Sequence, residues 1–223
     1  MGASIVIGVI VAVFIGLIVV NVQLALWLRG FRRGAPAEAV VVLGRGKPWS
    51  RLIADYDKSD LEAIVRFLER RGKDFSFYVH PGADQVRRIM ADRRVREVFF
   101  VGHGSPHFFR LGRGEILYYC AFADAGLYGK ELVHQVHCGG PGGISLIERV
   151  VPVENRHRCF YIGREIRSRD IQKGFERLRG FYPESHAATG YANPAKSRTM
   201  KNRVRGPYST ARFCRVYPDP EGI

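Results

Sequence analysis

The chain has 223 residues, a formal net charge of +14 and a pI of about 10.1. This charge points to a negatively charged partner, either a nucleic acid or an anionic membrane surface. The basic residues are spread along the chain, and residues 187–217 contain no acidic residue at all. No Cys-x-x-Cys pair occurs, which argues against a disulfide framework and a zinc ribbon. The four cysteines are Cys120, Cys138, Cys159 and Cys214.

The N-terminal segment is apolar and has no charged side chain before Arg29. About 20 apolar residues cross the hydrocarbon core of a bilayer, so residues 1–30 are predicted to form a transmembrane anchor. A cleaved signal peptide is the alternative. The chain start lacks the positive charge of such peptides, and the Ala-Pro-Ala at residues 35–37 lies far beyond the apolar run.

Basic residues follow this segment directly, at Arg29, Arg32 and Arg33. The positive-inside rule then predicts a single-pass protein of the cell membrane, with its N-terminus outside and its main domain in the cytosol. These arginines would also lie against anionic headgroups. Behind the anchor we expect a juxtamembrane basic linker, one α/β domain and a basic C-terminal segment, at residues 31–37, 38–182 and 183–223.

Strands and helices alternate in the first half of the soluble part. Continuous apolar runs predict buried strands, and period-3.6 apolar patterns predict helices. In residues 58–72, Ser59 and Glu62 form a capping-box pattern and Gly72 ends the helix. The expected inward residues are Leu61, Ile64, Val65 and Leu68 in this helix, and Val86, Ile89 and Met90 in the next one. The expected elements are strands at 39–43, 75–79 and 96–102 and helices at 58–72 and 82–94.

The second half is less regular. Residues 114–122 fit a strand or one arm of a hairpin, and residues 130–138 fit a fourth core strand that stops at Cys138. Residues 158–163 are predicted to form a further strand, and residues 168–180 a helix with Ile171, Phe175 and Leu178 inward. The whole pattern predicts right-handed crossovers and a parallel sheet with helices on both faces.

Two of these strands end in reactive side chains. The third strand stops at His103 and the fourth at Cys138, and a glycine follows each of them. Ligands bind beyond the carboxyl ends of the strands in open parallel sheets, so adjacent strands would bring both residues to one edge. An imidazole there could take the proton of a thiol, which is a nucleophile only as a thiolate. Gly104 and Gly139 would let the backbone approach a substrate carbonyl closely.

This order of elements resembles the caspase-like cysteine peptidases, which include caspases, metacaspases and the bacterial CHAT proteases. The matching motifs are FFVGHGS at 99–105 and LVHQVHCGG at 132–140. The stretch HFFRLGRGEILYY at 107–119 is similar to the extended segment that follows the histidine in CHAT proteases. The resemblance covers residues 38–180 and implies a three-layer fold with a mostly parallel sheet flanked by helices.

The resemblance also implies roles for individual residues. His103 would be the general base and Cys138 the nucleophile, and the backbone N–H groups of Gly104 and Cys138 would form the oxyanion hole. Metacaspases carry an acidic residue two positions before the cysteine, where this chain has Val136. Caspases have glutamine at that position, whereas Gln135 here lies three before. The family's substrate preferences therefore do not carry over.

A metal site is an alternative use of the histidines, because zinc accepts imidazole and thiolate ligands. The candidates are His103, His107, His134, His137 and Cys138. Two observations weigh against it. His134 and His137 are three residues apart in a strand, so their side chains point to opposite faces of the sheet. His103 and His107 flank a proline in a loop, so they do not have the i, i+4 spacing of a helix face.

Simpler interpretations remain open. A loop histidine is often incidental, and a buried cysteine is a common core residue. Cys120 and Cys159 lie among apolar neighbours and are expected to be such core thiols. No G-x-S-x-G elbow occurs, and GRGKPWS at 44–50 lacks the P-loop spacing, so serine-hydrolase and nucleotide chemistry have little support.

The sequence thus predicts a membrane-anchored cysteine endopeptidase that uses no cofactor and no metal. Its partners would be a protein or peptide substrate, the lipid bilayer and a regulatory protein. One alternative is an inactive caspase-like domain that serves as a membrane-tethered scaffold. Another is a membrane protein that binds nucleic acid through the basic stretch at residues 196–206.

Overall fold

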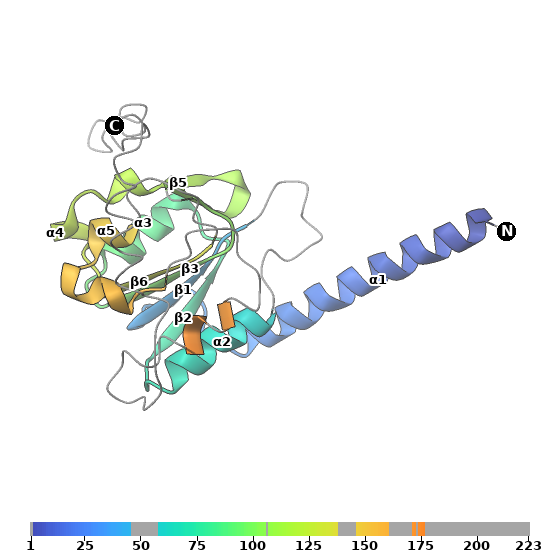
Figure 1. Ribbon diagram of the computed structural model, residues 1–223, viewed down its shortest axis with the longest axis horizontal. Coiled ribbons are helices and arrows are strands. Elements are labelled where there is room, and N and C mark those ends of the chain that lie inside the picture. The colour runs from blue at the N-terminus through green and yellow to red at the C-terminus, as the bar shows by residue number, and fades with distance from the viewer. Residues whose placement is uncertain are drawn as a thin grey trace.

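The structure is a computed structural model that describes residues 2–45, 58–105, 107–137, 146–160, 171–172 and 174–176. A long N-terminal helix, α1 (Gly2–Arg29), projects from an α/β domain (Figure 1). The core of that domain is a four-stranded parallel sheet in the order β2-β1-β3-β6. Its strands are β1 (Ala39–Leu43), β2 (Phe75–Val79), β3 (Glu97–Val101) and β6 (Leu132–Val136).

The strand order follows from the alternation of strands and helices. Helix α2 (Lys58–Glu69) joins β1 to β2, and α3 (Ala83–Ala91) carries the chain back across β1 to β3. Crossovers between parallel strands are right-handed, so the two helices must cover opposite faces of the sheet. Figure 1 shows α2 below the sheet and α3 above it. The predicted α/β fold, with a mostly parallel sheet flanked by helices, is confirmed.

Further elements complete both faces. Phe99 of β3 packs against Phe67 of α2 and against Phe175 in the helical residues 174–176. On the other face, Phe100 packs against Phe109 and Tyr119. These two residues belong to a short antiparallel hairpin and the 3-10 helix that follows it. The elements on this side are β4 (Phe108–Arg110), η1 (Gly112–Gly114), β5 (Ile116–Tyr118), η2 (Tyr119–Phe122) and α4 (Ala125–Tyr128).

The remaining described elements follow β6. They are α5 (Leu146–Val150), which contacts β6, and η3 (Val153–Arg158). The predicted strand at 158–163 is described only through Phe160, and this part is not a strand. Phe160 nevertheless runs beside β6, because its carbonyl accepts a hydrogen bond of 2.8 Å from the amide of Gln135.

The helix predictions are confirmed in their packing and corrected in one detail. All seven residues expected to face inward from α2 and α3 are buried. Gly72 ends α2 with a left-handed φ of 62°, and the amides of Gly72 and Lys73 bond back to Glu69 and Leu68 as in a Schellman motif. The helix begins at Lys58, however, so Ser59 lies inside its first turn and is not the capping residue of the predicted capping box.

The C-terminal end of α1 is part of the domain core. Leu24 and Leu28 are buried, and Trp27 lies edge-on to Phe77 of β2, with ring centroids 6.3 Å apart. Phe31, just past the helix, contacts Phe77 as well. Helix α1 is therefore fixed to the sheet by apolar packing over its last two turns.

The segment after α1 continues along the edge of the sheet. The amide of Phe77 donates to the carbonyl of Arg32, and the amide of Gly34 donates to the carbonyl of Phe77. The guanidinium of Arg33 donates to the carbonyls of Ala25 and Leu28 and so caps the end of α1, while Arg32 pairs with Asp74. Within residues 31–37, the expected juxtamembrane linker, Arg32 and Gly34 are thus bonded to β2.

Replacing Leu28 with alanine is expected to lower the free energy of unfolding of the domain by about 2–5 kcal/mol, because it leaves a cavity between α1 and the sheet. Leu26→Ala is the matched control, since this side chain in the same turn is 55% exposed. Urea unfolding of both variants in detergent micelles, followed by near-UV circular dichroism, measures the difference. Equal stabilities would show that α1 does not contribute to the core.

Candidate active site at the carboxyl end of the sheet

The two strands that precede His103 and Cys138 are neighbours in the sheet. β3 and β6 pair in parallel over five residues, from Glu97 opposite Leu132 to Val101 opposite Val136. Both strands end at this last pair. His103 and Cys138 each follow two residues later in the sequence, so both come after strands that end at the same edge of the sheet.

Backbone contacts fix the loop that carries His103. The amide of Gly102 donates to the carbonyl of Val136 at 3.3 Å, and the amide of Arg110 donates to the carbonyl of His103 at 2.9 Å. Gly102 has a φ of 145°, a conformation open to glycine, and a Cβ there would lie 3.3 Å from the Cα of Gly44. The loop is therefore held between β6 and the β4–β5 hairpin, and the side chain of His103 is exposed to solvent.

Cys138 lies outside the described residues, and so does the segment up to residue 145. The residue before it, His137, is described and is 1% exposed. The structure therefore fixes the chain up to the peptide bond that leads into Cys138. The predicted oxyanion role of the Cys138 and Gly104 amides stays a prediction.

His137 is held in place from three sides. Its Nε2 lies 2.6 Å from the hydroxyl oxygen of Tyr119 and 3.4 Å from the side-chain nitrogen Nε2 of Gln135. A Cβ on Gly104 would lie 2.6 Å from the Nδ1 of His137 and 2.7 Å from the carbonyl oxygen of Phe108. Only glycine fits at position 104, so the loop after β3 rests directly on the imidazole beside Cys138.

His137, held by Tyr119, thus supports the loop after β3, a contact that the sequence did not suggest. The sequence marked His137 only as an alternative metal ligand, and Tyr119 only as part of an apolar stretch. The one available signal was that a buried imidazole needs a polar partner. The identity of that partner, 18 residues away in η2, depends on how the hairpin folds over the sheet.

Two histidines of the alternative metal site, His134 and His137, lie on opposite faces of the sheet. His134 stacks on Phe99 on the α2 face, whereas His137 contacts Phe109 and Tyr119 on the hairpin face. The prediction that they point to opposite faces is confirmed.

The surroundings of His107 also disfavour its charged form. Burial lowers the pKa of His107, and the charge of Arg149 lowers it further. Among the described residues, no group of three His, Cys, Asp or Glu side chains is placed to hold a metal ion.

The described thiols differ in their surroundings. Cys159 is 3% exposed, and burial raises its pKa to about 12. Its Sγ lies 3.5 Å from the amide nitrogen of Val133 and 3.7 Å from the carbonyl oxygen of Asn155. The prediction that Cys159 is a core thiol is confirmed, whereas Cys120 is half-buried.

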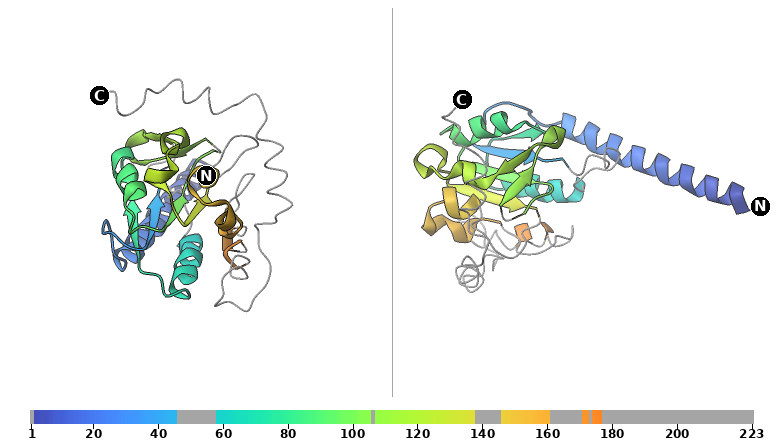
Figure 2. Two further views of the ribbon diagram at one scale, coloured as in Figure 1. Left: turned by 90° about the vertical axis from the view of Figure 1, so that its left-hand side faces the viewer. Right: turned by 90° about the horizontal axis from the view of Figure 1, so that it is seen from above.

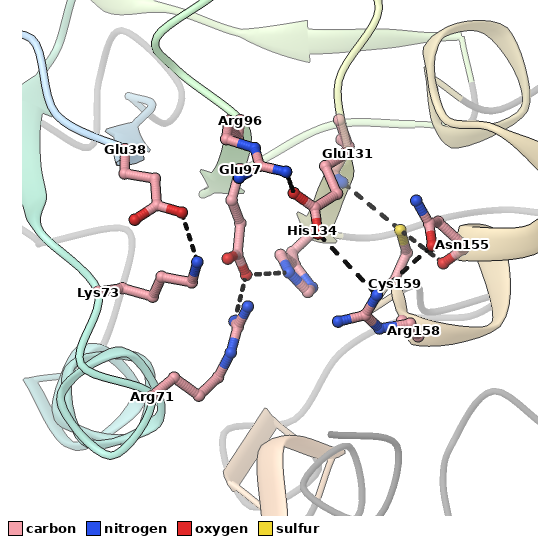
Figure 3. Close-up of polar contacts among 11 residues, drawn as sticks. Glu38, Arg71, Lys73, Arg96, Glu97, Glu131, His134, Asn155, Arg158 and Cys159 are labelled. Carbon is pink, nitrogen blue, oxygen red and sulfur yellow. Dashed lines mark hydrogen bonds and ion pairs between the residues drawn. The ribbon is translucent and has the colours of Figure 1, made fainter. Parts of the chain in front are cut away.

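A second cluster of polar side chains lies in the core, away from the carboxyl end. One oxygen of Glu97 accepts from Arg71 at 2.7 Å and lies 2.8 Å from the Nε2 of His134 (Figure 3). Glu97 and His134 are 3% and 0% exposed. Because Glu97 and His134 lie at the start and middle of their strands, this cluster is separate from the loop of His103.

Hydrogen bonds determine the protonation state of His134. Its Nδ1 accepts from the amide of Phe160 at 2.9 Å, so the proton is on Nε2 and is donated to Glu97. A second proton on Nδ1 would point at the Phe160 N–H. Burial accordingly lowers the pKa of His134, although its bond to Glu97 opposes this shift. Burial alone would raise the pKa of Glu97, but its bonds to His134 and Arg71 lower it below the usual value.

These contacts make the Glu97 cluster a structural network. It joins the turn after α2, β3, β6 and the segment at Phe160, and the carboxylate neutralises a guanidinium that is only 9% exposed. Phe99 stacks on the His134 ring, and Phe67 lies edge-on to it. This network is not predictable from the sequence, because Arg71 and Glu97 occur in stretches that look like ordinary solvent-exposed ends of elements.

Comparison with known proteins gives no relative from which a role could be transferred. A scan against protein-family models, a search of curated proteins and a search of solved structures each found no match to this chain.

Proposed function

We propose that this protein is a membrane-anchored cysteine endopeptidase in which His103 and Cys138 form a catalytic dyad. The observation that carries the proposal is the parallel, in-register pairing of β3 and β6, which end together at Val101 and Val136. The exposed imidazole of His103 stands at the end of one strand, and Cys138 follows the other by two residues. The strand order and the resemblance in the two motifs support the same proposal.

The chemistry follows from the residue types. His103 takes the proton of Cys138, and the resulting thiolate attacks the carbonyl carbon of the scissile peptide bond. The amides of Gly104 and Cys138 bind the negative oxygen of the tetrahedral intermediate. The imidazolium then protonates the leaving amine, and a thioester to Cys138 remains. Water activated by the same imidazole hydrolyses the thioester and restores the thiol.

Helix α1 supplies the anchor in this proposal. Residues Ile5–Arg29 are long and apolar enough to cross a bilayer, with a mean hydropathy of 3.1 in the most apolar window. Since Arg29, Arg32 and Arg33 lie at the domain end of the helix, the domain would face the cytosol. Packing of Trp27 and Leu28 against the sheet also favours a retained helix over a cleaved signal peptide, because cleavage after residue 37 would remove part of the core.

The pH dependence of alkylation tests the dyad without knowledge of the substrate. The thiolate fraction of an ordinary thiol, with a pKa of about 8.5, rises roughly 75-fold between pH 6 and pH 8. A thiolate stabilised by His103 is already formed at pH 6, so its rate of reaction with iodoacetamide should change by less than about threefold over this range. Mass spectrometry of tryptic peptides gives the rate for each cysteine of the full-length protein.

His103→Ala should restore the steep, ordinary profile at Cys138, and Cys120 in the same sample serves as the internal reference. If Cys138 of the unmodified protein shows the ordinary profile as well, the dyad is absent. The domain would then be better described as a membrane-tethered scaffold.

A further inference from the structure

Helix α1 runs antiparallel to the strands of the sheet. Phe31, at its end, contacts both Phe75 and Phe77 of β2, whereas Trp27, one turn earlier, contacts Phe77. Because β2 runs from Phe75 to Val79, moving back along α1 leads toward the carboxyl ends of the strands. Figures 1 and 2 show α1 continuing in this direction as a single straight helix that leaves the domain.

The exposed part of α1 is only long enough to cross the bilayer. No further stretch of helix therefore separates the membrane from the domain. The uninterrupted exposed apolar part of α1 extends from Ile5 to Val22. From Leu24 onward one side of the helix is buried against the domain, while Leu26 on the other side stays exposed. Eighteen helical residues span about 27 Å at about 1.5 Å each, close to the roughly 30 Å of a bilayer's hydrocarbon core. The membrane surface must therefore lie within about one helical turn of Leu24.

The polar residues of α1 agree with this boundary. Asn21 and Gln23 are the two uncharged hydrogen-bonding side chains in the apolar stretch between Ile5 and Leu26. The side-chain amide of Asn21 donates to the carbonyl of Leu17 at 2.7 Å, so this group is satisfied within the helix itself. Both residues lie where the helix passes from lipid to the domain.

The carboxyl end of the sheet is consequently the part of the domain next to the bilayer. The exposed His103 lies beyond this end. The turn between α3 and β3 lies at the opposite end, and the side chain of Arg94 in this turn is 73% exposed. Because α1 is packed on the sheet and residues 32–34 are bonded to β2, the domain cannot swing freely about the anchor.

We infer that the docked helix α1 holds the carboxyl end of the sheet, with His103, against the lipid headgroups, while Arg94 faces the aqueous phase. The substrates are then extended segments of other membrane proteins directly beside the bilayer, an assignment that rests on the proposed peptidase function. The orientation itself follows from α1 and does not depend on the reaction.

Fluorescence quenching measures this orientation in the full-length protein, reconstituted into vesicles of phosphatidylcholine and phosphatidylserine. Cys120, Cys138 and Cys214 are replaced by serine, and the buried Cys159 is kept. A bimane label is placed on His103→Cys in one sample and on Arg94→Cys in another. Lipids that carry a nitroxide on the headgroup should quench the label at position 103 at least about threefold more strongly than the label at position 94, since contact quenching requires proximity.

A Gly-Ser linker inserted between Val22 and Gln23 is the matched control, because it frees the domain while keeping both the anchor and the packed turns. It should make the quenching at the two positions nearly equal. Equal quenching without the linker, or stronger quenching at position 94, would overturn the inferred orientation. The alkylation profile of Cys138 is measured independently, so a failure of the orientation and a failure of the peptidase proposal are distinguished.

Discussion

Replacing Cys138 with alanine should abolish peptide-bond cleavage, with a loss of about 10⁴-fold or more, because removal of a catalytic nucleophile leaves only the contribution of binding and the oxyanion hole. His103→Ala should cause a similar loss at neutral pH, since the thiol then lacks its base. The two losses should not add in the double variant, because both residues act in one step. New N-termini in membrane proteins co-reconstituted with the enzyme, identified by mass spectrometry, provide the measurement.

Cys120→Ala is the control for this experiment. It removes a half-buried thiol from η2 and should leave cleavage within about twofold of the unmodified rate, because most substitutions away from a site have small effects. Retained cleavage in Cys138→Ala would refute the assignment of Cys138 as the nucleophile. Full loss of cleavage in Cys120→Ala would indicate that Cys120 is the nucleophile instead.

Replacing Glu97 with glutamine is expected to destabilise the domain by about 3–5 kcal/mol, the usual cost of breaking a buried ion pair. The amide keeps the shape of the side chain but removes the negative charge of Glu97 from the buried guanidinium of Arg71. Glu62→Gln on the surface of α2 is the matched control. Its carboxylate lies 3.4 Å from Lys58 and 3.9 Å from Arg66 at exposed positions, so about 0–1 kcal/mol is expected.

The same network predicts loss of stability in acid. The pKa of His134 is lowered in the folded state, so below about pH 6.5 the unfolded chain takes up a proton that the folded chain does not. The pKa of Glu97 is lowered as well, and its contribution is lost as the pH falls below about 4.5. Urea unfolding should therefore show a decline below about pH 6.5 that comes from His134 and persists in the Arg71→Met/Glu97→Gln double variant, and a further decline below about pH 4.5 that this variant lacks. An identical decline of both proteins below pH 4.5 would contradict the role of Glu97.

The sequence predicted the sheet well because buried parallel strands are marked by short, continuous apolar runs. The residues 39–43 and 75–79 form β1 and β2 with the expected bounds, and β3 and β6 lie within the expected ranges. The last part of the predicted strand at 114–122 differs. Only Ile116–Tyr118 pairs with β4, and the chain then turns into η2, which buries Tyr119 and Phe122 over the sheet. This turn depends on the hairpin's position in the fold, which local composition does not reveal.

The candidate site was predictable only in part for the same reason. Residues after strand ends can be found from the sequence, and the pairing of β3 with β6 confirms that the strands before His103 and Cys138 end at one edge. The supports of the site come from distant segments, such as Tyr119 on His137 and the backbone of Phe108 against Gly104. The packing of α1 on β2 was also not predicted, because the apolar residues that dock on the sheet look the same as those that face lipid.

The most direct test of the proposed dyad is disulfide trapping between positions 103 and 138. Residues joined by a disulfide have Cα atoms roughly 4.4–6.8 Å apart, a separation that residues beyond two adjacent strands can reach. His103→Cys in a Cys120→Ser/Cys214→Ser background is oxidised in the membrane, and non-reducing peptide mapping detects the bond. The proposed arrangement predicts a disulfide between Cys138 and position 103 and none between Cys138 and a cysteine at Arg94. No disulfide at position 103, with Cys138 still open to alkylation, would contradict it.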